Sequence, residues 1–250
     1  MRVQDCDIIF ESGQMTRRVS VIVPLYNYAH LIEETLDTVA AQTERDLALI
    51  VIDDCSPDES VAKVAAWMER HVDNGLGLRL CRNRANARLS VTRNTGIAQA
   101  NSPYCFLLDA DNLLYRRCIE KHATALDSRP DADAAYSLIE VFEGNIDLIG
   151  TGVFYREGLR HGNFIDAMAM IRTIALKGFE GYADIRHGWE DYDLWLRMVE
   201  ANRLALHIPE ILSRYRQHNT SMLRTQTNVA RNIRDLHQDM TRRHPWLALH

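Results

Sequence analysis

The sequence predicts an α/β fold built on a doubly wound, mostly parallel sheet. Short apolar runs rich in β-branched residues alternate with amphipathic helical stretches over the first half of the chain. Two of these runs, residues 19–25 and 47–52, are apolar on both faces, which is typical of central strands covered by helices on either side. The chain has 250 residues, enough for one α/β domain with a small extension.

Composition excludes several classes of protein. Hydrophobic residues make up 46% and charged residues 25%, which excludes whole-chain disorder, collagen and coiled coil. The formal charge is −5, so we expect no nucleic-acid partner. No apolar run is long enough to span a bilayer, and the N-terminus does not resemble a signal peptide. Five cysteines without a Cys-x-x-Cys pair indicate reduced thiols, and hence a cytoplasmic protein.

The elements of the first half follow in order. Residues 1–18 have no clear period, and we expect either a mobile arm or an addition to the sheet edge. The predicted strands are residues 19–25, 47–52, 76–80 and 104–108, and the predicted helices are residues 30–42, 56–71, 90–100 and 114–126. The segment from Ser56 to Glu59 predicts a helix start, with Ser56 as N-cap, Pro57 at the first helical position and Glu59 in a capping box.

After Pro130 the rhythm changes. The remaining predicted elements are strands 134–142 and 148–155 with a turn at Gly144-Asn145, helix 190–201, strand 204–208 and a polar helix 220–242. We divide the chain into an arm (1–18), one domain (19–223) and a C-terminal helix and tail (224–250). The arginines of the tail predict a solvated helix face, with contact to anionic lipid as the weaker alternative.

Polar residues follow three of the predicted strands, where an open α/β sheet binds its ligands. They are Tyr26-Asn27, Asp53-Asp54 and Asp109 to Asn112. Strand alternation would point Asp109 and Asp111 to the same side, where they suit a divalent cation that also holds phosphate oxygens. The alternative is that Asp-x-Asp only ends a strand or caps a helix.

The other polar candidates are equally ambiguous. One carboxylate of Asp53-Asp54 can accept hydrogen bonds from a ribose or base, while the other caps the helix that follows. Glu190 and Asp191 open a helix, where acidic residues favour the helix dipole, and they point roughly 100° apart, so they cannot share one role. There is no dinucleotide fingerprint and no P-loop.

Taken in order, these motifs resemble those of the inverting family 2 glycosyltransferases of the GT-A fold. The similar segments are residues 19–27, 42–43, 51–56, 93–97, 108–111, 188–195 and 215–222. Among them, Leu108-Asp109-Ala110-Asp111 resembles the Asp-x-Asp motif, 188–195 resembles Gly-x-Glu-Asp-x-Asp-Leu-Trp, and 215–222 resembles Tyr-Arg-x-His-x-x-Ser-Met. The departures are Cys55 for a Gly, Ala87-Arg88 for a frequent Gly-Gly, and Asn112 for a frequent Asp, whose oxygen still suits a metal.

The resemblance implies a role for each matching residue. The nucleotide-sugar-binding residues would be Pro24, Tyr26, Asn27, Asp54, Arg93 and Asp109. Asp111 would hold the metal, Mn²⁺ or Mg²⁺, with His218 and Asp109 beside it. Asp191 would be the catalytic base, ionised at neutral pH because it begins a helix, and Glu190 would position the acceptor.

The implied donor is a nucleotide-diphosphate sugar, with UDP as the expected nucleotide, and the implied acceptor is a saccharide or lipid-linked hydroxyl. Peripheral contact with the inner face of a membrane fits such acceptors, and the oligomeric state stays open. Two other functions remain: a catalytically silent GT-A domain that binds nucleotide or a partner, and a nucleotidyltransferase. The joint presence of Asp54, Asp111, Asp191 and His218 favours an active transferase.

Overall fold

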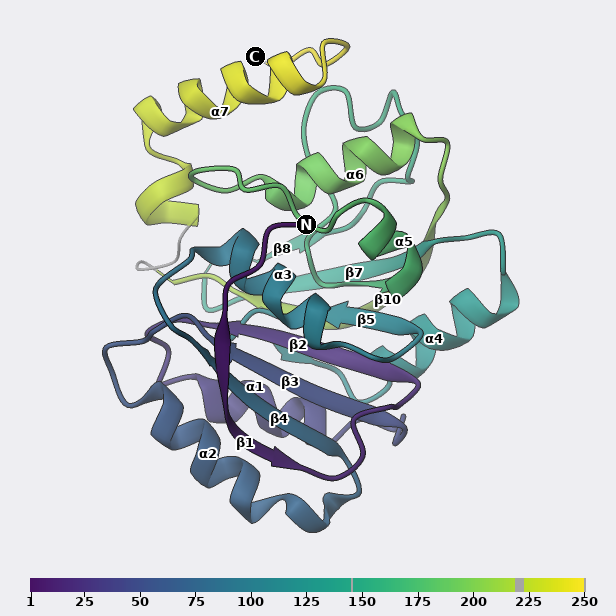
Figure 1. The fold of residues 1–250 in the computed structure, drawn as a ribbon. Helices are drawn as coiled ribbons and strands as arrows, with labels where there is room; N and C mark the ends of the chain where they lie inside the picture. Colours follow the sequence, from purple (N-terminus) through teal and green to yellow (C-terminus); the bar gives the residue numbers. More distant parts are fainter. Residues whose placement is uncertain (145, 219–222, 250) are drawn as a thin grey trace.

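The computed structural model describes residues 1–144, 146–218 and 223–249 (Figure 1). Its strands are β1 (Cys6–Ser12), β2 (Val19–Leu25), β3 (Leu47–Asp53), β4 (Gly77–Asn83), β5 (Tyr104–Leu107), β6 (Leu113–Leu114), β7 (Ala134–Phe142), β8 (Asp147–Ile149), β9 (Ala169–Arg172) and β10 (Ala205–Arg216). Its α-helices are α1 (Ile32–Ala40), α2 (Ser60–Arg70), α3 (Leu89–Gln99), α4 (Cys118–Ser128), α5 (Thr173–Gly178), α6 (Glu190–Glu200) and α7 (Ala230–Arg243).

The strands form one mixed, largely parallel sheet in the order β1-β4-β3-β2-β5-β9-β7-β10-β6, with β8 paired to β7. The strands β2, β3, β4 and β5 run parallel, as do β7 and β10. The antiparallel pairings belong to β1, β6, β8 and β9. The predicted α/β class with a mostly parallel sheet is therefore confirmed.

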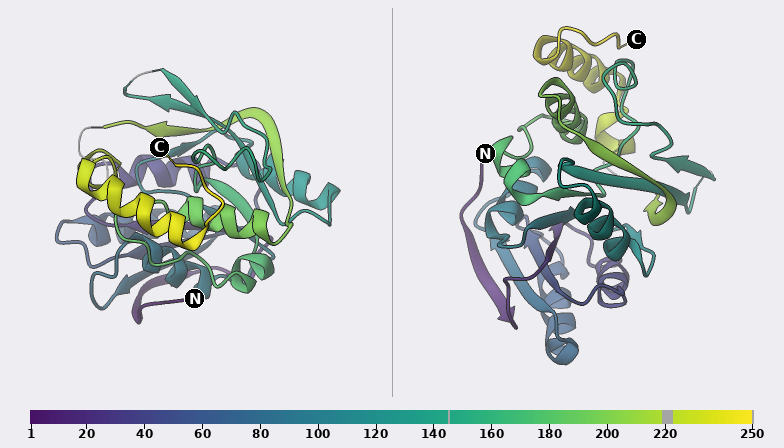
Figure 2. Two further views of the ribbon diagram at one scale, coloured as in Figure 1. Left: turned by 90° about the horizontal axis from the view of Figure 1, so that it is seen from above. Right: turned by 90° about the vertical axis from the view of Figure 1, so that its right-hand side faces the viewer.

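Helices cover both faces of the sheet, so the apolar side chains form two cores (Figures 1 and 2). Along β2, Val21 and Val23 pack with α1 and α2, whereas Ile22 packs on the other side with α3. A β-carbon at Gly96 of α3 would lie 2.4 Å from the Ile22 side chain, so only glycine allows this helix to approach the sheet so closely. Successive side chains of one buried strand therefore contribute alternately to the two apolar cores.

Residues 6–12 are an edge strand, antiparallel to β4, which is one of the two alternatives predicted for the N-terminal segment. One expectation about the first half changes. The helix predicted from Ser56 begins at Ser60, with Glu59 as its N-cap and no capping side chain. The Ser56 hydroxyl instead accepts the main-chain N–H of Asn27 and so joins the turn after β3 to the turn after β2.

The second half departs further from prediction. The strand predicted at 148–155 is limited to β8, and the short elements β6, β9 and α5 were not predicted. Strand β10 runs twelve residues, far beyond the predicted end at 208, because register shifts between Ile208 and Ser213 let it pass Pro209. The tail forms a π-helix, Leu223–Thr227, and then α7, while Asn145 and residues 220–222 lie outside the described residues.

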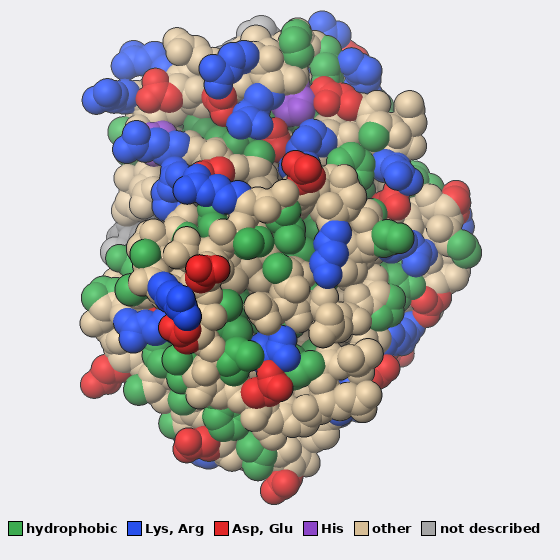
Figure 3. All heavy atoms as spheres, viewed as in Figure 1, with side chains coloured by type: hydrophobic (Ala, Val, Ile, Leu, Met, Phe, Trp, Pro, Cys, Tyr) green, Lys and Arg blue, Asp and Glu red, His purple; other side chains and the backbone are tan. Residues whose placement is uncertain are grey.

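The helix α7 packs beside α6 at one end of the molecule (Figure 2). Leu236 and Met240 are buried against the core, and His244 bonds to Asp193 of α6. On the face seen in Figure 3, arginine and lysine side chains around this end are interspersed with carboxylates. Arg242 and Arg243 both pair with Asp239. No helix in the described part of the chain is long and apolar enough to cross a membrane.

Candidate active site

The carboxyl ends of the parallel strands bring the predicted polar residues to one edge of the sheet. Leu25 at the end of β2 pairs with Asp53 at the end of β3, and β5 ends beside Ile22. Pro24 is buried within β2, while Tyr26 and Asn27 follow it and are exposed. This edge is where the strand order of an open α/β sheet leaves room for a ligand.

Asp54 is buried and serves as an anchor for the start of α3. Its carboxylate accepts the main-chain N–H groups of Ala87 and Arg88 at 2.8 and 2.9 Å and the Asn83 amide at 2.8 Å. Asp53 accepts the N–H of Ser56 in the turn before α2 and pairs with Arg82. Asp54 therefore holds the two residues that lead into α3, and it does not cap the helix that follows it in the chain.

Arg88 adopts a left-handed conformation with φ of 72°, at the position where a glycine was expected. Its main chain donates to Asp54, and its guanidinium pairs with Asp184 at 2.9 Å. The Arg88 side chain is thus held by the loop that precedes α6.

Arg93 joins the donor side of the edge to the helix that carries the predicted base. It is 2% exposed, and its guanidinium bonds to Asp109 at 2.7 Å and to Glu190. The second oxygen of Glu190, Oε2, is buried and has no hydrogen-bond partner among the described residues. Because a buried carboxylate oxygen is costly to leave unsatisfied, Glu190 is suited to accept a hydrogen bond from a ligand.

Asp111 and His218 form a second pair at the same edge. His218 Nε2 lies 2.9 Å from Asp111 Oδ2, and Tyr28 Oη lies 3.5 Å from the same ring nitrogen. Burial and the Asp109 carboxylate raise the pKa of Asp111, while the His218 contact lowers it. Strand alternation does not explain this placement, because β5 ends at Leu107 and both aspartates lie in the turn beyond it.

The Asp111–His218 pair fits a divalent cation as a partial ligand set. Within the described residues no group of three or more His, Cys, Asp or Glu side chains is arranged to hold a metal. A cation that takes one or two protein ligands and completes its shell with water and phosphate needs no larger group. The side-chain oxygen of Asn112, which was expected to suit the metal, accepts the main-chain N–H of Arg216.

Asp191 lies beside Glu190 but points elsewhere. Its carboxylate accepts hydrogen bonds from the Asn163 amide at 2.9 Å and from the N–H of Tyr192 at 2.8 Å. Burial, together with the nearby carboxylates of Glu190 and Asp166, raises the pKa of Asp191 to about 8. Burial and the neighbouring carboxylates therefore oppose the ionisation that the start of a helix favours.

Sequence reasoning missed the loop between β8 and β9. It supplies Asn163, which bonds to Asp191, and Asp166, whose pKa is raised to about 6 by burial and by the Asp109 carboxylate. No motif or period in residues 150–168 marks these two residues. Tyr28 and Tyr215 also face the carboxylates, and burial raises the pKa of both phenols.

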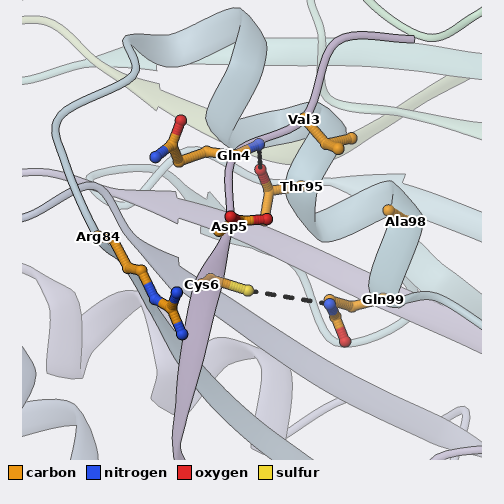
Figure 4. Close-up of a pocket in the computed structure, with 8 residues that line it drawn as sticks. All are labelled: Val3, Gln4, Asp5, Cys6, Arg84, Thr95, Ala98 and Gln99. Carbon is orange, nitrogen blue, oxygen red and sulfur yellow. Dashed lines mark hydrogen bonds between the residues drawn. The ribbon is translucent and has the colours of Figure 1, made fainter.

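A surface hollow of about 430 Å³ lies apart from these residues (Figure 4). It is lined by the N-terminal segment and by one side of α3, including Gln4, Cys6, Thr95 and Gln99. Gln4 donates to Thr95 through its main chain, and Gln99 approaches the Cys6 sulfur. None of the predicted site residues lines it.

The model of one protein family, described as glycosyl transferase family 2, matches residues 20–175. The chain belongs to glycosyl transferase family 2. The predicted family, and with it an inverting glycosyltransferase, is therefore confirmed. The matched region contains the nucleotide-side residues and Asp111, while Asp191 and His218 lie beyond it.

Several proteins are similar to this family 2 chain. EpsE of Bacillus subtilis strain 168, named a putative glycosyltransferase, is 24% identical over 83% of this chain and 76% of its own length. TarP of Staphylococcus aureus strain N315, named a poly(ribitol-phosphate) β-N-acetylglucosaminyltransferase, is 36% identical over 42% of this chain and 31% of its own length.

Solved structures show the same fold. TarS of S. aureus, crystallised with UDP-GlcNAc, has a TM-score of 0.69 at 18% identity, over 83% of this chain and 61% of that one. The mannosyltransferase PcManGT of Pyrobaculum calidifontis, in complex with GDP-Man and Mn²⁺, has a TM-score of 0.61 at 23% identity, over 83% and 59%. The family 2 chain thus spans about three fifths of the length of these structures.

Proposed function

We propose that this chain transfers a sugar, with inversion, from a nucleotide-diphosphate sugar to a hydroxyl of a saccharide or lipid-linked acceptor, with help from Mn²⁺ or Mg²⁺. One observation carries the proposal. The Asp111–His218 pair and the Glu190–Asp191 pair lie at the same sheet edge, and buried Arg93 bonds both to Asp109 and to Glu190, which is 97 positions after it in the chain.

The donor side would use the ends of β2, β3 and β5. Pro24, Tyr26 and Asn27 would line the nucleotide pocket, and Asp54 would accept a hydrogen bond from the base or ribose through the acceptor capacity that its three internal bonds leave. Asp109 would accept a bond from the ribose while Arg93 fixes its orientation. The complexes of TarS with UDP-GlcNAc and of PcManGT with GDP-Man support UDP or GDP sugars as the donors to test.

Asp111 and His218 would hold the cation, which neutralises charge on the diphosphate leaving group when bound. The Mn²⁺ in the PcManGT structure supports this choice of metal. We keep the division into residues 1–18, 19–223 and 224–250 as part of the proposal.

On the acceptor side, Asp191 would take the proton of the attacking hydroxyl. Asn163 holds one oxygen of Asp191 and the Tyr192 N–H holds the other, so the carboxylate has a fixed direction. Glu190 Oε2 would accept a hydrogen bond from the acceptor. A single displacement from the face opposite the leaving group inverts the anomeric carbon.

The test is a screen of UDP and GDP sugars for nucleotide release, with Mn²⁺ and with a chelator, using water as the acceptor. We expect release from at least one donor, dependent on metal and lost in Asp111→Ala. The anomeric configuration of the first product, read by NMR, must be opposite to that of the donor. Tight nucleotide binding without release from any donor, with or without saccharide acceptors, would favour the catalytically silent domain.

A further inference from the structure

Arg216 stands two residues before His218 in the Tyr-Arg-x-His segment, and the proposed function gives it no role. Its side chain is buried, with 5% exposed, at the carboxyl end of β10. Its Nε donates to the main-chain carbonyl of Asp111 at 3.0 Å. Its own N–H donates to the side-chain oxygen of Asn112 at 2.9 Å. Two hydrogen bonds therefore tie residue 216 to the Asp-x-Asp turn.

These bonds close a ring around the proposed metal pair. From Asp111 the ring runs through its carbonyl to Arg216, along two residues of chain to His218, and back through the 2.9 Å contact between Nε2 and Asp111 Oδ2. The turn at 109–112 is not part of any strand. Its position relative to His218 therefore depends on the Arg216 side chain and on Asn112, in addition to the short pairing of β6 with β10.

The Arg216 guanidinium also contacts residues outside the Asp-x-Asp turn. It pairs with Glu34 of α1 and with Glu143 beyond β7, and it lies 4.6 Å from the centre of the Phe142 ring. Arginine is suited to this position because one planar group donates in several fixed directions at once, which lysine cannot reproduce. Both glutamates are more than half exposed, so solvent also reaches their carboxylates.

We propose that Arg216 is a positioning residue that sets the geometry of Asp111 relative to His218, and through it the affinity of the site for a divalent cation. The inference rests on the proposed function for the role of the metal. Partners that orient metal ligands typically contribute 10- to 100-fold to metal affinity. We expect Arg216→Lys to weaken Mn²⁺ binding, in the presence of UDP or GDP, by about tenfold or more.

The chain offers a matched control in Arg172. This arginine also clamps main-chain carbonyls, those of Ala132 and Leu126, at 2.7 and 2.8 Å. It stands opposite Tyr104 at the start of β5, away from the carboxyl edge of the sheet. Arg172→Lys therefore makes the same chemical change where no metal pair depends on it.

The experiment has two readouts. The first is the ¹⁵N and ¹H imidazole signals of His218 in the metal-free chain at one pH, assigned among the 10 histidines with His218→Gln. Asp111→Asn calibrates the shift that accompanies loss of the contact. The second is Mn²⁺ affinity by electron paramagnetic resonance. We expect Arg216→Lys to shift the His218 signals in the direction of Asp111→Asn, while Arg172→Lys leaves both readouts at wild-type values.

If Arg216→Lys does not fold, the double variant Glu34→Gln, Glu143→Gln removes the two ion pairs of the guanidinium. We then expect smaller changes in the His218 signals and in Mn²⁺ affinity, in the same direction as for Arg216→Lys. Wild-type His218 signals in the folded variants would overturn the inference. The same holds if Arg172→Lys moves them equally. A wild-type chain that binds no Mn²⁺ with any nucleotide would overturn the metal-dependent function, while the His218 signals still decide whether Arg216 positions the pair.

Discussion

Replacing Asp191 by Asn separates a catalytic base from a residue that only complements a helix dipole. The substitution keeps the size and removes the ability to take a proton. A general base contributes roughly 10²- to 10⁴-fold to rate, so we expect turnover to fall by that factor, equivalent to roughly 2.7–5.4 kcal/mol of activation free energy. Donor affinity should hardly change, because the contacts of Asp191 are with Asn163 and Tyr192.

The structure also bounds the effect on stability. Asp191 accepts two hydrogen bonds, and an amide oxygen can face only one of the two donors, so one bond worth about 0.5–1.5 kcal/mol is lost. The change also removes a carboxylate that Glu190 and Asp166 disfavour in its charged form. The two effects oppose each other, so the free energy of unfolding at neutral pH should stay within about 1 kcal/mol of wild type.

Asp193 provides the control, because it lies in the same first turn of α6 but faces away from the site. It is 1% exposed and bonds to Arg197 and His244. Asp193→Asn should lower the free energy of unfolding by about 1.5–3 kcal/mol, the range for bonds to charged groups, with little effect on turnover. Melting temperature, nucleotide affinity by calorimetry and metal-dependent nucleotide release are measured on both variants. Wild-type turnover in folded Asp191→Asn would refute the assignment and make Glu190 the next candidate.

Three further outcomes follow from the same geometry. The ratio kcat/KM for the donor should rise with pH toward about 8, because burial and the neighbouring carboxylates raise the pKa of Asp191 in the free enzyme. Stability should fall with pH between the unfolded pKa near 4 and that value. A flat kcat/KM profile would contradict this. Asp54→Ala should weaken nucleotide binding by about 1–3 kcal/mol and also lower the melting temperature, since the main-chain N–H groups of Ala87 and Arg88, before α3, lose their acceptor; unchanged calorimetric affinity would place the base pocket elsewhere. Asp111→Ala should make nucleoside diphosphate affinity equal with Mn²⁺ and with chelator, and a persisting difference would exclude Asp111 as the ligand.

Local sequence signals predicted the parts of the fold that depend on local physics. The runs of β2 and β3 are buried along their whole length, so their apolar composition alone identified them. The four-residue β9 and the two-residue β6 were missed because so short a strand is determined by the strands it pairs with. The full length of β10 was missed because Pro209, inside it, is a residue that usually ends a strand. Strand ends were the useful guide to the site, since parallel strands bring their ends together wherever their connections run.

What the sequence could not supply was the partner of each site residue. Arg93 bonds to a carboxylate 97 positions away, and Asp54 to amides more than thirty positions away. Neither pairing has a local period or motif. The raised pKa of Asp191 reflects burial and the carboxylates of Glu190 and Asp166, and Asp166 comes from a loop that no pattern singles out. The helix-dipole argument included none of these contributions.

The carboxylates of the site explain one another's behaviour once they are considered together. Burial and the Asp109 and Asp111 carboxylates raise the pKa of Asp166. Burial and the Glu190 and Asp166 carboxylates raise that of Asp191, while Arg93 lowers both. Burial and the crowding of carboxylates at this edge therefore favour the protonated form of Asp191. Under the proposed function, positive charge brought to Asp111 lowers the pKa of Asp166 and, through it, favours ionisation of Asp191. The cation of the proposed site would then favour ionisation of the base in addition to neutralising charge on the leaving group.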